Sequence, residues 1–232
     1  ADGADFIEPD LVLTKDGVLV ARHENEISET TDVADKPQFA DRKATKMIDG
    51  QKMTGWFTED FTLAELKTLR AKERLPLLRK ANTAYDGAFE IPTFEEIIRL
   101  AKTKEKESGR RIGIYPETKH PSYFASIGLP HEAPLLAMLE KHGYVQKDDP
   151  LFIQSFEVGN LKALRGKTKL RLIQLMSKDD GPADDPSARY ADMATPAGLG
   201  ALAITVSPPP VTAPATSETL NSSLRPSTKE PR

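Results

Sequence analysis

The sequence predicts an α/β fold of the (β/α)8 TIM-barrel type. Between residues 111 and 176, short apolar strands alternate with helical segments in the order β-α-β-α-β, which is typical of a parallel sheet. No Gly-rich phosphate loop opens any of these helices, which favours a barrel over a dinucleotide-binding half. With 232 residues, of which 38% are hydrophobic, the chain can bury one sizeable core.

A β-hairpin is the first predicted element. Residues 4–21 contain two β-rich runs on either side of an Asp-Gly turn signal at 16–17. With a two-residue turn, Asp10 stands opposite His23, and the alternation of side chains along a strand puts Glu8 on the same face as Asp10. We therefore expect three polar groups to converge on one face of the hairpin.

From about residue 26 to about residue 90 the chain is polar and mixed, and we interpret this stretch as an insertion with some structure of its own. It contains one clear helix, because Thr62 and Glu65 form a capping box ahead of a leucine repeat. Trp56 is expected to pack under a loop. A second capping box at Thr93 begins the next helix. A strand, a helix, a strand, a helix and a strand are then predicted at residues 111–119, 131–144, 150–156, 158–166 and 169–176.

The last part of the chain differs in composition. Beyond Tyr190 there is no aromatic residue, and residues 200–232 are rich in Pro, Ser and Thr. Such a segment cannot bury enough apolar surface to order itself. We therefore expect residues 1–199 to form the folded region and residues 200–232 to be a disordered tail.

Composition excludes several classes of partner and chemistry. The 32 basic and 35 acidic residues give a formal net charge of −3, so no positive field favours nucleic acid or an anionic membrane. The absence of cysteine excludes disulfides, thiolate zinc sites and cysteine nucleophiles. No apolar run of about 18 residues is present, and the chain does not open on a charged segment followed by an apolar one. We therefore predict neither a stable membrane insertion nor a signal peptide, and the oligomeric state is left open.

Acidic side chains follow two predicted strands. Glu117 and Lys119 are two residues apart, so they point the same way at the end of the strand at residues 111–119. Because barrel active sites are built at the carboxyl ends of the strands, Glu8, Asp10 and Glu117 could form a carboxylate site for Ca²⁺ or Mg²⁺. A lysine for an anionic oxygen and His23 for proton transfer would border it, a combination that suits phosphoryl chemistry.

Five stretches of the sequence carry a family resemblance: "GADFIEPDLVLTKDGVLVARHENEIS", "GWFTEDFTLAELKTLRA", "IPTFEEII", "IGIYPETK" and "IQSFE". Together they resemble the bacterial glycerophosphodiester phosphodiesterases of the periplasmic type, from about Gly3 to about Leu199. The resemblance implies a (β/α)8 barrel with an insertion after its second strand, at about residues 26–90. It also implies a bound Ca²⁺ or Mg²⁺, hydrolysis of glycerophosphodiesters to glycerol 3-phosphate and an alcohol, and a periplasmic or exported location.

The resemblance also implies roles for single residues. The metal ligands match Glu8, Asp10 and Glu117, and one of two catalytic histidines matches His23. Lys119 matches a residue near the substrate phosphate. Gln154 and Phe156 fall on a strand-end motif that looks like the lining of a substrate pocket, with core packing an equal alternative for Phe156.

Parts of the family pattern are expected to lie outside this chain. Family members begin with a strand carrying His-Arg-Gly, a Glu-Asn pair and a first helix, all of which would precede Ala1, so that Gly3 reads as the residue after that helix. They also continue through further barrel strands where this chain enters its Pro/Ser/Thr tail. We therefore expect a truncated barrel without its first and last strands, and an enzyme impaired by the truncation. The alternatives are a non-catalytic remnant that binds metal or phosphodiester, and an interaction module whose acids are solvated strand edges.

Three further histidines are assigned structural or solvent-exposed roles. His120 follows the predicted strand at 111–119 and could face substrate, but it is expected to be a solvated loop residue. His131 and His142 lie at the ends of a predicted helix, where capping or interaction with the helix dipole is the default. None of the three is placed in the catalytic set.

Overall fold

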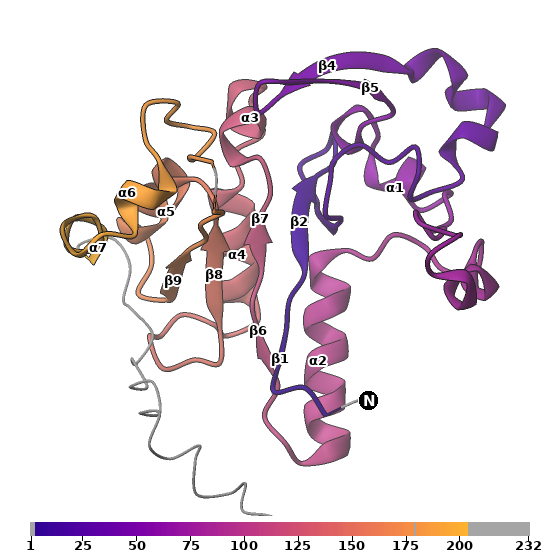
Figure 1. Cartoon of the computed structure of the whole chain (residues 1–232). Helices are drawn as coiled ribbons and strands as arrows, with labels where there is room; N and C mark the ends of the chain where they lie inside the picture. The colour runs from indigo at the N-terminus through magenta and orange to yellow at the C-terminus, as the bar shows by residue number, and fades with distance from the viewer. Residues whose placement is uncertain (1–2, 179, 204–232) are drawn as a thin grey trace, which may run out of the picture.

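The centre of the protein is an open, mostly parallel sheet, seen in a computed structural model that describes residues 3–178 and 180–203 (Figure 1). Its five strands lie in the order β3-β2-β7-β8-β9, and only β3 is antiparallel to its neighbour. A short parallel pair, β1-β6, precedes β2 and β7, and Pro9 and Pro116 separate the pieces because proline has no N–H for the ladder. The strands are β1 Phe6–Ile7, β2 Asp10–Leu13, β3 Leu19–Ala21, β6 Gly113–Ile114, β7 Glu117–Thr118, β8 Phe152–Ser155 and β9 Arg171–Gln174.

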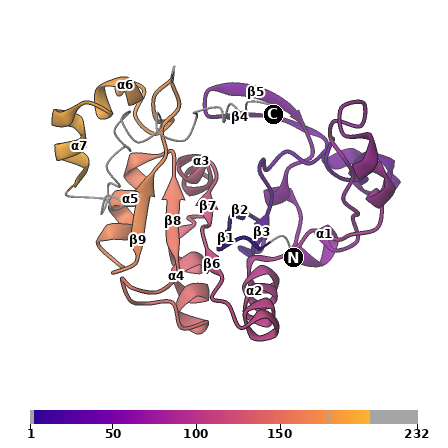
Figure 2. The ribbon, with the colours of Figure 1, turned by 60° about the horizontal axis from the view of Figure 1, so that its bottom comes forward.

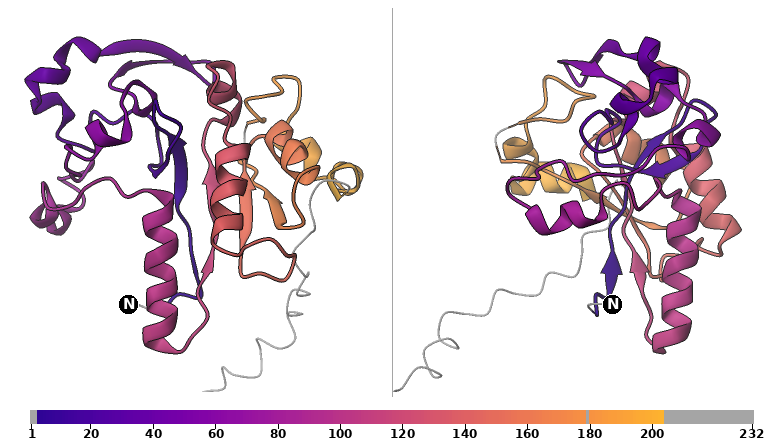
Figure 3. Two further views of the ribbon diagram at one scale, coloured as in Figure 1. Left: turned by 180° about the vertical axis from the view of Figure 1, so that it is seen from behind. Right: turned by 90° about the vertical axis from the view of Figure 1, so that its right-hand side faces the viewer.

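The predicted alternation of strands and helices is confirmed. Among the described residues the sheet does not close into a barrel. Helix α2 packs against β3 and β6, and α5 packs against β8 and β9; Figure 3 shows α2 and α4 on the same side of the strands. The helices are α1 Leu63–Leu66, α2 Phe94–Ser108, α3 Pro121–Ser126, α4 Glu132–Lys141, α5 Val158–Arg165, α6 Tyr190–Met193 and α7 Pro196–Ala203. Both predicted capping boxes are present, at Thr62 with Glu65 and at Thr93 with Glu96.

The insertion, which joins the end of β3 to the start of α2 in the sequence, forms a lobe beside the sheet (Figures 1 and 2). As expected, Trp56 is buried, and its Nε1 donates to the carbonyl of Phe39 at 2.6 Å. The sequence pattern did not predict the hairpin of β4 (Ala44–Ile48) and β5 (Gln51–Gly55), in which half of the residues are exposed. Figure 1 shows this hairpin crossing above the carboxyl ends of β2 and β7. Four short 3-10 helices also lie in the insertion, at Val33–Asp35, Pro37–Arg42, Thr58–Asp60 and Lys80–Tyr85.

The predicted register of the first hairpin is wrong by one residue. Leu13 pairs with Leu19, so Asp10 stands opposite Arg22, whose N–H donates to the Asp10 carbonyl at 3.0 Å, and not opposite His23. The physical reason is a loop of three residues rather than two. Thr14 closes the loop, because its Oγ1 accepts from the N–H of Val18 at 2.9 Å and its own N–H donates to the Val18 carbonyl.

The predicted tail falls largely outside the described residues. Its first four residues, 200–203, belong to α7, and 204–232 lie beyond the part of the chain that the structure describes. Gly3 has φ 82°, the left-handed backbone expected of a residue that follows a helix. Within the described residues, no helix has both the length and the apolar character needed to cross a membrane.

Candidate active site

A cluster of three carboxylates lies where β2 and β7 run side by side. The parallel register sets Asp10 beside Glu117, and Glu8 precedes Asp10 by two residues. One carboxylate oxygen from each of Glu8, Asp10 and Glu117 lies within 4.8 Å of the others. Glu8 is exposed, Asp10 is half-buried and Glu117 is 5% exposed. The predicted convergence of the three acids is therefore present, and the parallel ladder between β2 and β7 brings it about, as expected from the strand ends.

The electrostatics of the cluster favour a bound cation. Burial raises the pKa of Glu117 to about 7; Lys119, whose Nζ lies 3.1 Å from Oε1 of Glu117, opposes the rise, and the charge of Asp10 adds to it. A divalent cation among the three carboxylates would remove their mutual repulsion, and hard oxygen ligands are those that such ions prefer. The residues present therefore fit a metal ion, and the role of Glu8, Asp10 and Glu117 as its ligands stays a prediction.

Gln154 lies on β8, on the opposite side of β7 from Asp10, and it is buried. Its Nε2 donates a hydrogen bond to Oε1 of Glu8. Register also pairs Gln154 directly with Glu117. Gln154 therefore holds a candidate metal ligand in place, and its predicted contact with substrate stays a prediction.

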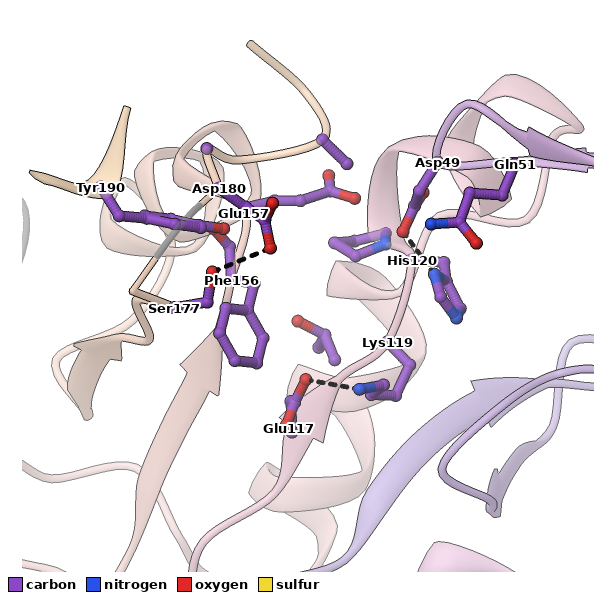
Figure 4. A pocket seen from close by; sticks show the side chains of 14 residues that line it. Asp49, Gln51, Glu117, Lys119, His120, Phe156, Glu157, Ser177, Asp180 and Tyr190 are labelled. Atoms are coloured by element: carbon purple, nitrogen blue, oxygen red, sulfur yellow. Dashed lines mark hydrogen bonds and ion pairs between the residues drawn. The ribbon is translucent and has the colours of Figure 1, made fainter. Parts of the chain in front are cut away.

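A cavity of about 510 Å³ adjoins the cluster on the side of β8 and β9, and we call it the end cavity (Figure 4). Phe156 lines it, which favours the pocket interpretation of this residue, and its ring packs edge-on against Tyr190 with centroids 6.1 Å apart. Glu157 also lines it, and burial raises the pKa of Glu157 to about 7 despite the hydrogen bonds it accepts from Ser122. The cavity wall thus combines aromatic and acidic side chains with two basic ones, Lys119 and His120.

His23 lies on the other side of the cluster, in a shallow groove of about 370 Å³ along the edge of β1 and β2. We call this the edge groove, and Glu8, Asp10, Arg22 and His23 are among its lining residues. The His23 side chain is 62% exposed, and its Nδ1 lies 2.7 Å from Oε1 of Glu24. The structure therefore brings His23 to the carboxylates even though the register that predicted this is wrong.

Arg22 is a site residue that the sequence pattern did not single out. Burial lowers its pKa to about 10. Its Nε and Nη2 are buried and have no hydrogen-bond partner in the part of the chain that the structure describes. A guanidinium with two such donors beside His23 can contact an anionic oxygen. The local sequence gave no signal for Arg22, because the burial of its guanidinium and the partners of its donors depend on how the loop after β3 folds.

His120 was also missed, and the expectation of a solvated loop residue is wrong. Its side chain is only 13% exposed, and its two ring nitrogens face Oδ2 of Asp49 at 2.6 Å and Oε2 of Glu24 at 3.0 Å. Burial alone would lower the pKa of His120, but the hydrogen bonds to Asp49 and Glu24 outweigh it and raise the pKa to about 9. His120 is therefore a largely buried, positively charged side chain at the rim of the end cavity.

The helix-end histidines also have structural roles, but only one of them matches its expectation. His142 is the C-cap residue of α4, where its N–H donates to the carbonyl of Leu139 at 3.1 Å, and its Nε2 lies 3.3 Å from Oε1 of Glu95 in α2. His131 makes no side-chain cap to α4. It is 0% exposed, and its Nε2 lies 3.2 Å from the carbonyl oxygen of Leu11 in β2. His131 is thus a core histidine behind the site.

Fold and site together define a class of protein: an α/β protein with a parallel sheet, a cluster of three carboxylates that could hold a metal ion, and a lysine and a histidine nearby. The chain belongs to the glycerophosphoryl diester phosphodiesterase family, whose family model matches residues 1–217. The family resemblance read from the motifs is thereby confirmed.

Curated relatives support the same family. A glycerophosphodiester phosphodiesterase from Arabidopsis thaliana is 39% identical over 210 residues, covering 85% of this chain and 55% of the relative. Another from Haemophilus influenzae is 32% identical over 201 residues, covering 78% of this chain and 51% of the relative. The chain thus spans about half the length of the curated relatives that it matches.

A solved structure supports the fold alone. The Oleispira antarctica phosphodiesterase OLEI02445, in complex with the product sn-glycerol-3-phosphate, matches with a TM-score of 0.51 at 20% identity. The match covers 88% of this chain and 61% of that one.

Proposed function

We propose that the protein is a metal-dependent phosphodiesterase that hydrolyses glycerophosphodiesters to glycerol 3-phosphate and an alcohol. The observation that carries the proposal is the convergence of Glu8, Asp10 and Glu117 within 4.8 Å, with Lys119 beside them, in a chain of this family. The names of the curated relatives support the substrate class.

The proposed roles follow from the position of each side chain. Glu8, Asp10 and Glu117 hold Ca²⁺ or Mg²⁺, which when bound supplies positive charge against the phosphoryl oxygens. Lys119, buried beside Glu117, presents its ammonium group to a phosphate oxygen. His23, on the rim of the edge groove, transfers a proton to or from the oxygen of the alcohol or of water.

We also propose a periplasmic or exported location, which rests on the resemblance to the periplasmic family members alone. Fractionation of cells that express the complete gene product would test it. Recovery of the protein with cytoplasmic markers would contradict it.

Metal binding is the first test of the proposed function. Calorimetric titration of the 232-residue chain with CaCl₂ and with MgCl₂ should show binding of at least one of the two ions. Removing one carboxylate charge, in Glu8→Gln or Glu117→Gln, should abolish or strongly weaken it, because few ligands remain. The matched control is Glu107→Gln on α2, an exposed acid paired with Lys104 and outside the cluster. Equal heats for all four proteins would refute the metal site.

Turnover is the second test. Release of glycerol 3-phosphate from glycerophosphocholine should depend on the added metal ion. His23→Ala should lower the rate by about 10²- to 10⁴-fold, the usual effect of losing a general acid or base. A change below about threefold would assign His23 to structure. Metal binding without hydrolysis would instead support the alternative of a non-catalytic protein that binds metal or phosphodiester.

A further inference from the structure

An unbroken chain of hydrogen bonds links the insertion to His23. Oδ2 of Asp49 lies 2.6 Å from Nδ1 of His120, and Nε2 of His120 lies 3.0 Å from Oε2 of Glu24. Oε1 of Glu24 then lies 2.7 Å from Nδ1 of His23. Figure 4 shows the link between Asp49 and His120 at the rim of the end cavity. We call this series of four side chains the Asp49–His23 relay.

The chemistry of the relay fixes where its protons lie. Both ring nitrogens of His120 face carboxylate oxygens, and only the doubly protonated imidazolium can donate to both. With His120 charged, Glu24 stays ionised; burial opposes this, but the hydrogen bond from His120 and its charge hold the pKa of Glu24 down to about 2. An ionised carboxylate can only accept, so Nδ1 of His23 must carry a proton.

The backbone of His120 supports a role beyond packing. Within the described residues, the only non-glycine residues with positive φ are Asp49, at 49°, and His120, at 50°. Asp49 and Gly50 form the two-residue turn between β4 and β5, where positive φ is the rule. No such turn explains His120, which also precedes Pro121, a position that disfavours helical backbone. The left-handed conformation is unfavourable for a residue with a side chain, and in it the imidazole lies between its two carboxylates.

We propose that Glu24 and His120 are positioning residues for His23, and that the Asp49–His23 relay holds its imidazole as the Nδ1–H tautomer with Nε2 as the basic nitrogen. The proposal rests on the proposed function, in which His23 transfers a proton. It adds that the β4-β5 hairpin, which supplies Asp49, belongs to the catalytic apparatus. An exposed ion pair such as His23–Glu24 would by itself do little to orient His23. Here, however, Oε2 of Glu24 also contacts Nε2 of His120, whose side chain is largely buried, so the carboxylate is fixed in place.

Nitrogen-15 NMR of the histidine rings tests the relay without using activity. The chain has four histidines, and loss of one signal in His23→Gln assigns His23. In its neutral form, His23 should show the Nδ1–H tautomer, and Glu24→Gln or His120→Asn should shift it toward the Nε2–H form. Asn is chosen at 120 because it tolerates left-handed backbone. The matched control is His142→Gln, which removes another histidine–carboxylate contact outside the relay and should leave His23 unchanged.

Kinetics provide a readout that separates the two proposals. In a hydrolysing enzyme, His120→Asn and Asp49→Asn should lower kcat by about 10- to 100-fold, the usual cost of losing a group that orients a catalytic residue, with KM within about twofold. A predominant Nε2–H form of His23 in the unaltered protein would refute the relay, whatever the activity. A predominant Nδ1–H form that is lost in the variants, in a protein without turnover, would support the relay and refute the proposed function.

Discussion

His131 should make the protein sensitive to mild acid. Burial lowers the pKa of His131 from 6.5 to about 3, so the neutral ring is required in the folded protein while the unfolded chain takes up a proton below pH 6.5. Because a depressed histidine pKa means that the unfolded state binds more protons, stability falls as the pH falls from 6.5 toward 3. Each pH unit in this window costs about 1.4 kcal/mol, so two units, from pH 6.5 to 4.5, cost about 2.7 kcal/mol.

The perturbation that isolates this effect is His131→Phe. A phenyl ring fills the same space and keeps an edge-on contact with Phe124, whose ring centroid lies 4.9 Å from that of His131. The variant loses the hydrogen bond to the carbonyl of Leu11, worth about 1 kcal/mol, but that oxygen still accepts from the N–H of Lys119 at 3.0 Å. At pH 7 the variant should therefore be up to about 1 kcal/mol less stable than the unaltered protein.

Urea unfolding, followed by circular dichroism from pH 7 to pH 4.5, measures the prediction. Other groups also titrate in this window, among them Glu157, so only the difference between the two proteins is informative. The free energy of unfolding of the unaltered protein should fall by about 2 to 3 kcal/mol more than that of His131→Phe. Parallel pH profiles for the two proteins would show that His131 is not held neutral, and the reasoning would fail.

Two further predictions concern the site and the helix beside it. Gln154→Leu should weaken metal binding by about 10- to 100-fold in calorimetry, because Glu8 loses the amide that orients it; an unchanged dissociation constant would contradict this. Thr93→Ala should destabilise the protein by about 1 kcal/mol in urea, because the cap of α2 is lost, and leave the metal affinity unchanged. A Thr93→Ser variant, which keeps the hydroxyl, is its control, and equal losses in both would count against the cap.

Local patterns predicted the parts of the fold that have local causes. The capping boxes at Thr62 and Thr93 were visible because each needs only a residue and its neighbour three positions on. The three acids were found because side-chain alternation and parallel pairing place strand ends together, whatever the length of the connection. Such features depend on short-range geometry, which one sequence displays.

The remaining features depend on loop length and on contacts between distant parts of the chain, which the local sequence pattern does not determine. The first hairpin took a three-residue loop because Thr14 could close it, and one added residue shifted every pair by one. The β4-β5 hairpin has the same Asp-Gly turn signal, at 49–50, but the residues of its two strands, ATKMI and QKMTG, do not alternate between apolar and polar types. His120 meets Asp49 and Glu24 across 71 and 96 residues of sequence, a contact that no local spacing reveals.

The two kinds of group in the site are therefore held by different means. Asp10 and Glu117 lie on adjacent strands, so their separation is set by ladder hydrogen bonds and changes little with the surroundings. His23 lies beyond the end of β3 with most of its side chain in water, so the ladder cannot orient its ring. Orientation has to come from a partner that is itself fixed, and Glu24, bonded to the buried His120, is such a partner. Changes in the β4-β5 hairpin should consequently alter proton transfer at His23. They should leave metal binding unchanged, because the Asp49–His23 relay does not include Glu8, Asp10 or Glu117.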